Sequence, residues 1–168
     1  LIRRLNDAVI STFQLERYLT GVFLLWDPAA RRLVWADMGH SHITLSRGGK
    51  TRFLSGSQSN LPVGLEQGIE PALYSMVLEA GDRLCVFTDG ITEQENPDKE
   101  EFGERRLFRL LGRMNRQSLA TACPDGLDGT EPAAGECLAT RIPRIMDAWR
   151  QGIPQQDDMS FILLETGD

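Results

Sequence analysis

The sequence predicts an α+β fold, in which mostly antiparallel strands form sheet layers with helices on their faces. Two observations lead to this prediction. Short apolar stretches of strand length alternate with turn residues through the first half of the chain, as in an antiparallel meander. Stretches with apolar residues at helical spacing lie at the start of the chain and again in its second half. At 168 residues, the chain is long enough to bury the core of one domain.

The first half of the chain contains a helix followed by strands. Leu1, Leu5 and Val9 recur at helical spacing, which predicts a helix over the first dozen residues. Asp27 and Pro28 predict the first turn, because proline presets its φ angle and aspartate caps the backbone. The expected strands are 20–26, 32–36, 43–46, 51–54, 73–78 and 83–87, with a compact apolar loop at 61–65.

The second half alternates polar segments with helices. A polar loop is expected at 92–101, and a helix with an apolar face at 104–114. Glycine, proline and aspartate at 115–132 predict a surface loop. A second helix at 133–150 is expected to be broken or kinked at Pro143, before a last strand at 159–165.

Composition excludes several classes of function. The formal net charge of −6 argues against a nucleic-acid or anionic-membrane binder, whose affinity needs a basic face. Three cysteines, Cys85, Cys123 and Cys137, form no CxxC pair, so reduced thiols in the cytoplasm are expected rather than disulfides or a zinc site. We expect no membrane span and no signal peptide, because no apolar run is long enough.

Acidic residues stand at the ends of two expected strands. Asp89 and Gly90 follow the strand 83–87, and Asp157 and Asp158 precede the last strand. Taken alone, each pattern is more typical of a turn than of a ligand. Two carboxylates that meet repel unless a cation or proton lies between them, and Mg²⁺ and Mn²⁺ prefer carboxylate oxygens. We therefore predict that the two strand ends meet around a divalent metal.

Several segments resemble a known family in sequence and in order. Gly-Asp-Arg-Leu-Cys-Val-Phe-Thr-Asp-Gly-Ile-Thr-Glu at 81–93 is followed by Asn-Pro-Asp at 96–98 and Glu-Phe-Gly-Glu-Arg-Arg-Leu at 101–107. These segments resemble the SpoIIE-like bacterial branch of the metal-dependent (PPM-type) serine/threonine protein phosphatases. Shorter segments also resemble the family: Ala-Asp-Met-Gly-His at 36–40, Leu-Pro-Val-Gly-Leu at 61–65 and Gln-Asp-Asp-Met-Ser at 156–160.

The resemblance implies a layered α-β-β-α sandwich and a set of site residues. Asp89 and Asp157 would be the catalytic carboxylates and metal ligands, Gly90 would shape the backbone at the metal, and Asp158 would be a neighbouring or alternative ligand. Two Mn²⁺ or Mg²⁺ ions are expected in the complete domain. The implied reaction is hydrolysis of phosphoserine or phosphothreonine by a metal-activated water, without a covalent intermediate.

Two departures from the family pattern bear on the extent of the domain. The family also has an upstream Gly-Asp segment, whose aspartate bridges both metals, and this chain has no such segment. The sequence also opens without methionine. Residues 1–168 are therefore expected to form one phosphatase domain that lacks its N-terminal part and is the C-terminal piece of a longer chain. The second departure is Asp37-Met38, which replaces the small residues usual before Gly39-His40.

The resemblance also implies partners. The expected substrate is a phosphorylated regulatory protein, such as an anti-sigma factor antagonist, in the cytoplasm, with a sensor or receiver domain upstream. The resemblance leaves open whether the protein forms a homodimer. Neither nucleic acid nor a membrane is expected to bind. One alternative is a catalytically degenerate phosphatase-fold module that binds a regulatory partner. Another is a structural domain in which Asp89 and Asp157 only cap turns.

Other polar groups have simpler interpretations. His40 and His42 would share a face of a strand end, where a metal pair is conceivable, but no third nitrogen or sulfur ligand is near and we favour structural histidines. The loop 92–101 lacks the spacing of a calcium loop, which favours a solvated loop. Arg105, Arg106 and Arg109 are expected on a helix surface, paired with Glu101 and Glu104.

Overall fold

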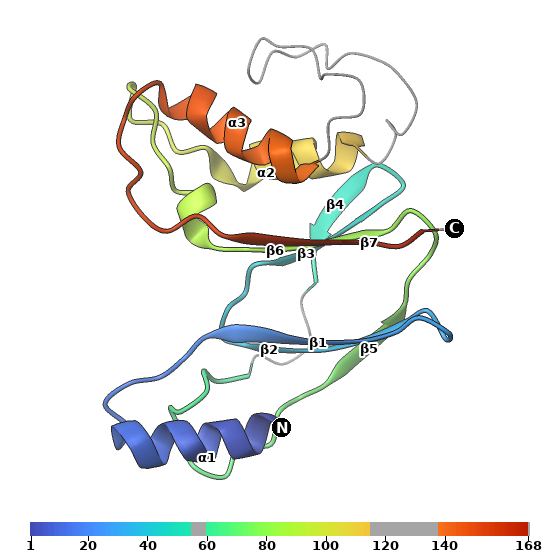
Figure 1. Cartoon of the computed structure of the whole chain (residues 1–168), viewed down its shortest axis with the longest axis vertical. Coiled ribbons are helices and arrows are strands. Elements are labelled where there is room, and N and C mark those ends of the chain that lie inside the picture. Colours follow the sequence, from blue (N-terminus) through green and yellow to red (C-terminus); the bar gives the residue numbers. More distant parts are fainter. Residues whose placement is uncertain (55–59, 115–137, 168) are drawn as a thin grey trace. The chain divides into compact units, whose positions relative to one another are not determined.

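The computed structural model of the chain describes residues 1–54, 60–114 and 138–167. The chain divides into two compact units, one made of Leu1–Ile43 and Leu54–Glu79 and the other of Thr44–Phe53 and Ala80–Asp168 (Figure 1). Each unit combines helix with antiparallel strand pairs, so the predicted α+β class is confirmed. The surface loop expected at 115–132 lies outside the described residues. Within the described ranges, no helix has the length and apolar character needed to cross a membrane.

The first unit places one helix beside a three-stranded sheet. Its sheet has the order β1-β2-β5, and both strand pairs are antiparallel. Asp27 forms the expected turn, because its Oδ1 accepts hydrogen bonds from the backbone N–H groups of Ala29 (3.0 Å) and Ala30 (3.1 Å). The elements are α1 (Ile2–Phe13), β1 (Gly21–Asp27), β2 (Arg32–Met38) and β5 (Tyr74–Val77).

The core of the first unit joins α1, the sheet and the loop at 61–65. Val9 of α1 packs with Ala36 and Met38 of β2 and with Val63 of the loop. The Asn6 Oδ1 also accepts a hydrogen bond from the Gly64 N–H at 2.7 Å. The apolar loop is therefore part of this core.

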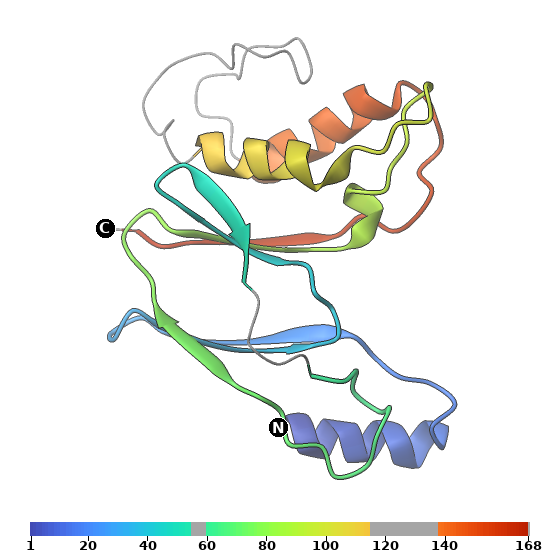
Figure 2. The same ribbon diagram turned by 180° about the vertical axis from the view of Figure 1, so that it is seen from behind.

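The second unit has a four-stranded sheet with two helices on one face (Figures 1 and 2). Its strand order is β4-β3-β6-β7. Apolar side chains of β6 and of both helices form one core, in which Phe87 packs with Leu107 and Ile145. The elements are β3 (Ile43–Arg47), β4 (Lys50–Phe53), β6 (Arg83–Phe87), α2 (Gly103–Met114), α3 (Leu138–Arg150) and β7 (Phe161–Glu165).

Two sequence expectations are corrected by this topology. The first four strands were expected to form one meander, but the hairpins β1-β2 and β3-β4 belong to different sheets. Alternation along a strand identifies the face that is buried, but it does not identify the strand that pairs with each edge. The second expectation was a helix broken or kinked at Pro143. The break is wrong, because Pro143 lies inside the continuous helix α3.

An ion pair with a buried carboxylate joins β3 to the turn before β6. Asp82 is 1% exposed, and its two carboxylate oxygens accept hydrogen bonds from the Arg47 guanidinium. The distances are 2.8 Å from Nε to Oδ1 and 2.5 Å from Nη2 to Oδ2. A two-point contact between arginine and carboxylate defines their relative orientation, so it fixes the start of β6 relative to β3.

Cys85 lies in β6 within the core of the second unit, and burial raises the pKa of its thiol from 9.0 to about 12. At about pH 8, only about one thiol in 10,000 is then ionised, and the thiolate is the reactive form. We expect iodoacetamide to leave Cys85 unmodified in the folded protein and to alkylate it in urea. Mass spectrometry of the peptide that contains Cys85 measures this, and rapid alkylation of the folded protein would contradict it.

The same raised pKa predicts how stability depends on pH. The unfolded chain releases the Cys85 proton near pH 9.0, whereas the folded protein holds it to about pH 12. The contribution of Cys85 to stability is therefore complete below pH 9.0 and falls by up to about 1.4 kcal/mol per pH unit above it. Cys85→Ala should remove this component, which a comparison of the two proteins in urea unfolding measures.

Candidate active site

The pairing of β6 with β7 brings two distant segments together. The strands run antiparallel, with Phe87 opposite Phe161. The residues that follow Phe87 therefore lie beside those that precede Phe161. The Thr88 N–H continues the ladder by donating to the Ser160 carbonyl at 3.0 Å. The structure thus brings the segment that carries Asp89 next to the segment that carries Asp157 and Asp158.

The hydroxyl of Thr88 fastens these segments to one another. It donates to the Asp158 carbonyl oxygen at 2.7 Å and accepts from the Ser160 N–H at 2.9 Å. One side chain therefore satisfies two backbone groups of the opposite segment, beyond the end of the regular strand pair. Sequence analysis missed this role of Thr88, although a hydroxyl that can both donate and accept was the available signal.

Gly90 lies against the backbone of the opposite segment. A Cβ atom at this position would lie 2.6 Å from the Asp158 carbonyl oxygen and 3.2 Å from the Asp157 carbonyl carbon. The residue is buried in the short 3₁₀ helix η1 (Asp89–Ile91). Glycine is therefore required by the close approach of two backbones, because any side chain would separate the acidic segments.

The carboxylates of Asp89, Asp157 and Asp158 are all exposed. One oxygen of Asp89 accepts from the Gly90 N–H at 3.0 Å, and one oxygen of Asp157 accepts from the Asp158 N–H at 2.7 Å. These local bonds hold the carboxylates of Asp89 and Asp157 by one oxygen each. Exposed carboxylate oxygens are suitable ligands for a hard divalent cation. Among the described residues, however, no three His, Cys, Asp or Glu side chains come together as a metal site.

The polar segment after η1 is folded, which corrects the expected solvated loop. Thr92, Gln94 and Asn96 are buried, whereas every residue from 97 to 101 is exposed. The carbonyl of Gln94 accepts from the Phe102 N–H at 2.9 Å, so the segment closes on itself. Buried amide side chains need partners, and composition alone does not identify these.

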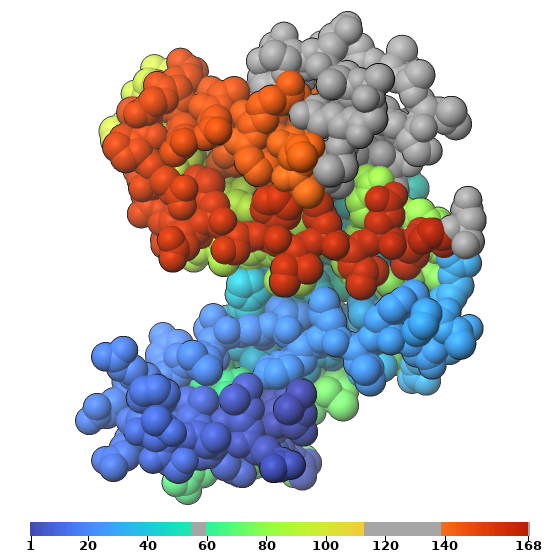
Figure 3. All heavy atoms as spheres, in the orientation of Figure 1, coloured from blue at the N-terminus to red at the C-terminus, as the bar shows by residue number. Residues whose placement is uncertain are grey.

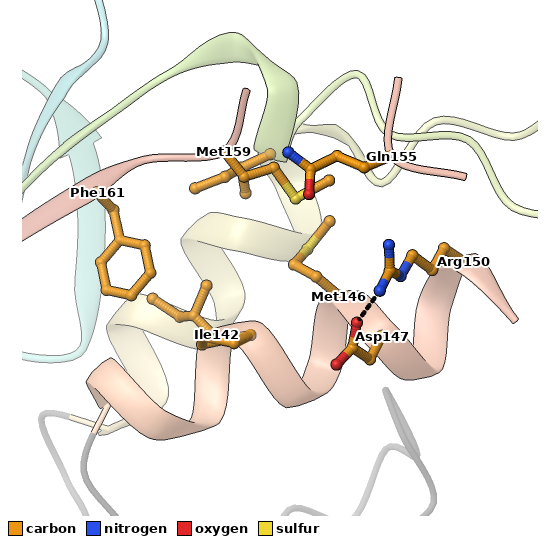
Figure 4. Close-up of a pocket in the computed structure, with 9 residues that line it drawn as sticks. Ile142, Met146, Asp147, Arg150, Gln155, Met159 and Phe161 are labelled. Atoms are coloured by element: carbon orange, nitrogen blue, oxygen red, sulfur yellow. Dashed lines mark hydrogen bonds and ion pairs between the residues drawn. The ribbon is translucent and has the colours of Figure 1, made fainter. Parts of the chain in front are cut away.

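A cavity of about 190 Å³ opens beside the acidic segments (Figure 4). Ile91 follows Gly90 and Met159 follows Asp158, so both segments contribute directly to its wall. An ion pair between Arg150 and Asp147, 2.6 Å long, lies on its α3 side. Figure 3 shows the atoms of α3 and of the segment leading into β7 side by side on one face of this unit. The lining residues are Ile91, Ile142, Pro143, Met146, Asp147, Arg150, Gln155, Met159 and Phe161.

Asp37 and the two histidines belong to the first unit. The Asp37 carboxylate accepts hydrogen bonds from the backbone N–H groups of His40 (2.8 Å) and Ser41 (3.0 Å). This bonding explains an acidic residue before Gly39-His40, because it caps the turn at the end of β2. The rings of His40 and His42 meet edge to face, with centroids 5.8 Å apart. This contact is consistent with structural histidines.

Arg106 stabilises the start of α2. Its Nη1 donates to the backbone carbonyls of Glu101 (3.1 Å) and Phe102 (3.0 Å), and its guanidinium lies 4.3 Å from the centre of the Trp149 ring. Its carboxylate partner is Glu100, at 3.4 Å, rather than the expected Glu101 or Glu104. This correction shows that residues before the helix can compete with helical neighbours for an arginine.

A family model for stage II sporulation protein E (SpoIIE) matches residues 1–167. The chain belongs to the SpoIIE family. The predicted resemblance to SpoIIE-like PPM phosphatases is therefore confirmed. In sequence, this SpoIIE-family chain is 27% identical to Protein IcfG of Synechocystis over 113 residues, which are 66% of this chain and 17% of that protein.

Solved structures of the SpoIIE type share the fold. The SiaA-PP2C domain of Pseudomonas aeruginosa aligns with a TM-score of 0.65 at 18% identity, over 98% of this chain and 67% of that chain. The SpoIIE phosphatase domain from Bacillus subtilis aligns with a TM-score of 0.55 at 18% identity, over 97% of this chain and 65% of that chain. The chain thus spans about two thirds of each of these structures and a smaller share of IcfG.

Proposed function

We propose that this SpoIIE-family chain is part of a metal-dependent phosphatase domain that hydrolyses phosphoserine or phosphothreonine on a regulatory protein. The observation that supports this most directly is the contact of Gly90 with the backbone of Asp157 and Asp158. It holds two acidic segments side by side at the end of one strand pair, with their carboxylates exposed to solvent. The degenerate binding module is not favoured, because the chain retains these acids within a phosphatase family.

Related structures support a divalent cation. The SpoIIE phosphatase domain from Bacillus subtilis has been solved after presoaking with Mn, and RsbX in complex with magnesium. In this chain, Asp89 and Asp157 would hold Mn²⁺ or Mg²⁺, with Asp158 as a neighbouring or alternative ligand and Gly90 shaping the backbone. A bound divalent cation acidifies water and neutralises the charge of a phosphoryl group.

The residues of this chain have distinct tasks in that proposal. Asp89 and Asp157 would bind the cation through their exposed carboxylates, while Thr88 fixes the opposing backbone through the Asp158 carbonyl. Gly90 excludes any side chain from the contact. Since fewer than three candidate ligands come together among the described residues, we propose that the upstream Gly-Asp aspartate expected from the family completes the site for two ions.

The finer functional assignment concerns the partner. The RsbU and RsbW domains of a Mycobacterium tuberculosis protein form one of the structures that share this fold, with a TM-score of 0.65 at 14% identity. We propose a phosphorylated regulator of the anti-sigma factor antagonist type as the substrate, in the cytoplasm. A sensor or receiver domain upstream and a homodimer are further parts of this proposal. The net charge of −6 would repel an acidic phosphoprotein. Bound cations would therefore also help to attract the phosphorylated substrate to the site.

Metal removal tests the proposal. In the full-length protein, a chelator should lower hydrolysis of a phosphoprotein or of p-nitrophenyl phosphate by at least about 100-fold, and added Mn²⁺ should restore it. A control with the chelator already saturated by Ca²⁺ separates metal removal from direct inhibition. Activity that persists after complete metal removal would contradict the metal-dependent mechanism, and a metal-replete protein without activity would contradict the hydrolase assignment.

A further inference from the structure

We infer that Gln156 and Glu95 form a clamp that positions the acidic segment 157–158 beside Asp89. Gln156 immediately precedes Asp157, and Glu95 belongs to the folded segment that follows η1. The inference rests on the proposed function only in taking Asp157 as a metal ligand. Neither residue touches the reacting groups in this proposal, so both are positioning residues.

The clamp consists of two reciprocal hydrogen bonds between residues 61 positions apart. The backbone N–H of Glu95 donates to Gln156 Oε1 at 3.0 Å. In return, Gln156 Nε2 donates to Glu95 Oε2 at 3.2 Å. The amide therefore uses its acceptor and its donor on one residue, which fixes both its position and its orientation.

Lys99 holds the Glu95 carboxylate in its ionised form, in which it accepts hydrogen bonds. Lys99 Nζ donates to Glu95 Oε2 at 3.0 Å, across one turn of chain. The hydrogen bonds from Lys99 and then from Gln156 lower the pKa of the Glu95 carboxyl. The carboxylate thus remains ionised at neutral pH and keeps accepting from the Gln156 amide.

Gln94 provides a buried base for the clamp. Its side chain is 1% exposed, and its Nε2 donates to the Glu95 carbonyl at 3.0 Å and to the Pro154 carbonyl at 3.4 Å. The backbone carbonyl of Gln94 accepts from the Trp149 Nε1–H at 2.9 Å. Glu95 is therefore anchored to α3 and to the start of the segment that the clamp holds.

The acidic segment needs such a clamp because it has no regular structure. Residues 151–160 form turns and coil between α3 and β7, so no helix or strand ladder fixes Asp157. On the β7 side, Thr88 holds Asp158 and Ser160. On the α3 side, the described hydrogen bonds to the neighbouring segment are those that Pro154 and Gln156 make with Gln94 and Glu95. Among these described bonds, loss of the clamp would leave only two long ones of 3.4 Å to Gln94 on this side. A small displacement of a catalytic group is costly.

A single variant and a double variant that exchanges the amide with the carboxylate test the clamp in the full-length protein. Gln156→Glu sets two carboxylates against each other, and we expect Mn²⁺ affinity to fall by about 10-fold. The added negative charge beside Asp157 would by itself strengthen cation binding, so a weaker affinity reports lost positioning rather than charge. In Glu95→Gln/Gln156→Glu, the new amide donates to the new carboxylate, and affinity should return to within about twofold of the wild type.

Gln151→Glu is the matched control, because it adds the same charge to an exposed residue of the same coil. Hydrogen exchange of the metal-free protein gives a second measurement that does not depend on activity. Gln156→Glu should speed exchange in peptides covering 156–160 by about 10-fold, and the double variant should restore it. Gln151→Glu should change neither measurement.

The outcomes separate the clamp from the proposed function. Unchanged exchange in Gln156→Glu, or a double variant that fails to recover, would overturn the clamp even if the wild type is an active phosphatase. If the wild type neither binds Mn²⁺ nor hydrolyses phosphoprotein while exchange changes as expected, the phosphatase proposal fails and the clamp stands as a structural device.

Discussion

Replacing Asp89 with asparagine is expected to lower phosphatase activity by at least about 100-fold, or about 2.7 kcal/mol in the activation free energy. Asparagine keeps an oxygen that can accept from the Gly90 N–H, as Asp89 does at 3.0 Å, so the local backbone should be preserved. It lacks the negative charge that a hard cation prefers in its ligands. Hydrolysis of a phosphoprotein in Mn²⁺ and calorimetric titration with Mn²⁺ measure the two effects.

Asp98→Asn is the control for this experiment, because Asp98 is an exposed carboxylate of the segment that follows η1. We expect it to retain full activity. If Asp89→Asn were as active as Asp98→Asn and bound Mn²⁺ with unchanged affinity, Asp89 would have no role at a metal. A loss of activity together with unfolding would instead point to the turn-capping role of Asp89.

Gly90→Ala should impair both stability and metal binding. The added Cβ would meet the Asp158 carbonyl oxygen at 2.6 Å, which is backbone and not the end of a flexible side chain. The two acidic segments must then move apart, and overpacking of this kind costs about 1–3 kcal/mol in the free energy of unfolding. Urea unfolding gives the loss of stability, and we expect Mn²⁺-dependent hydrolysis to fall by at least about 100-fold.

Gly21→Ala is a suitable comparison, because a Cβ at Gly21 meets nothing within 4 Å. Both substitutions remove a glycine, so they share the effect on the unfolded chain. The difference between them isolates the close contact at Gly90. A Gly90→Ala protein no less stable and no less active than Gly21→Ala would show that the segments can separate without consequence.

The strands that carry the candidate site could be predicted from the sequence. The apolar run between Gly81 and Gly90 marked β6, because burial on both faces leaves a clear signal. The apolar run after Ser160 marked β7 by its length, although that strand is only partly buried. Hairpins were also found from their turn residues. The assignment of β3 and β4 to the sheet of β6 could not be predicted, because pairing across distant edges leaves no trace in local alternation.

The polar connections of the site were missed for a different reason. The hydrogen bonds of Gln156 with Glu95 and of Arg47 with Asp82 join residues far apart in sequence. Such pairs have no periodicity, and the same residue types are common on any surface. The capping role of Asp37 is local and could have been predicted, because an aspartate that accepts from N–H groups a few residues later is a recurring turn.

The pairing of β6 with β7 also has a consequence for synthesis on the ribosome. Arg83 at the start of β6 is joined to Glu165 of β7, 82 residues later, by an ion pair of 2.7 Å. A nascent chain has therefore exposed Asp89 long before Asp157 leaves the exit tunnel. Until then, one edge of β6 is open to other chains, as unpaired strand edges are in partly made proteins. We expect the partial chain to be inert toward phosphoproteins and prone to aggregation through this open edge.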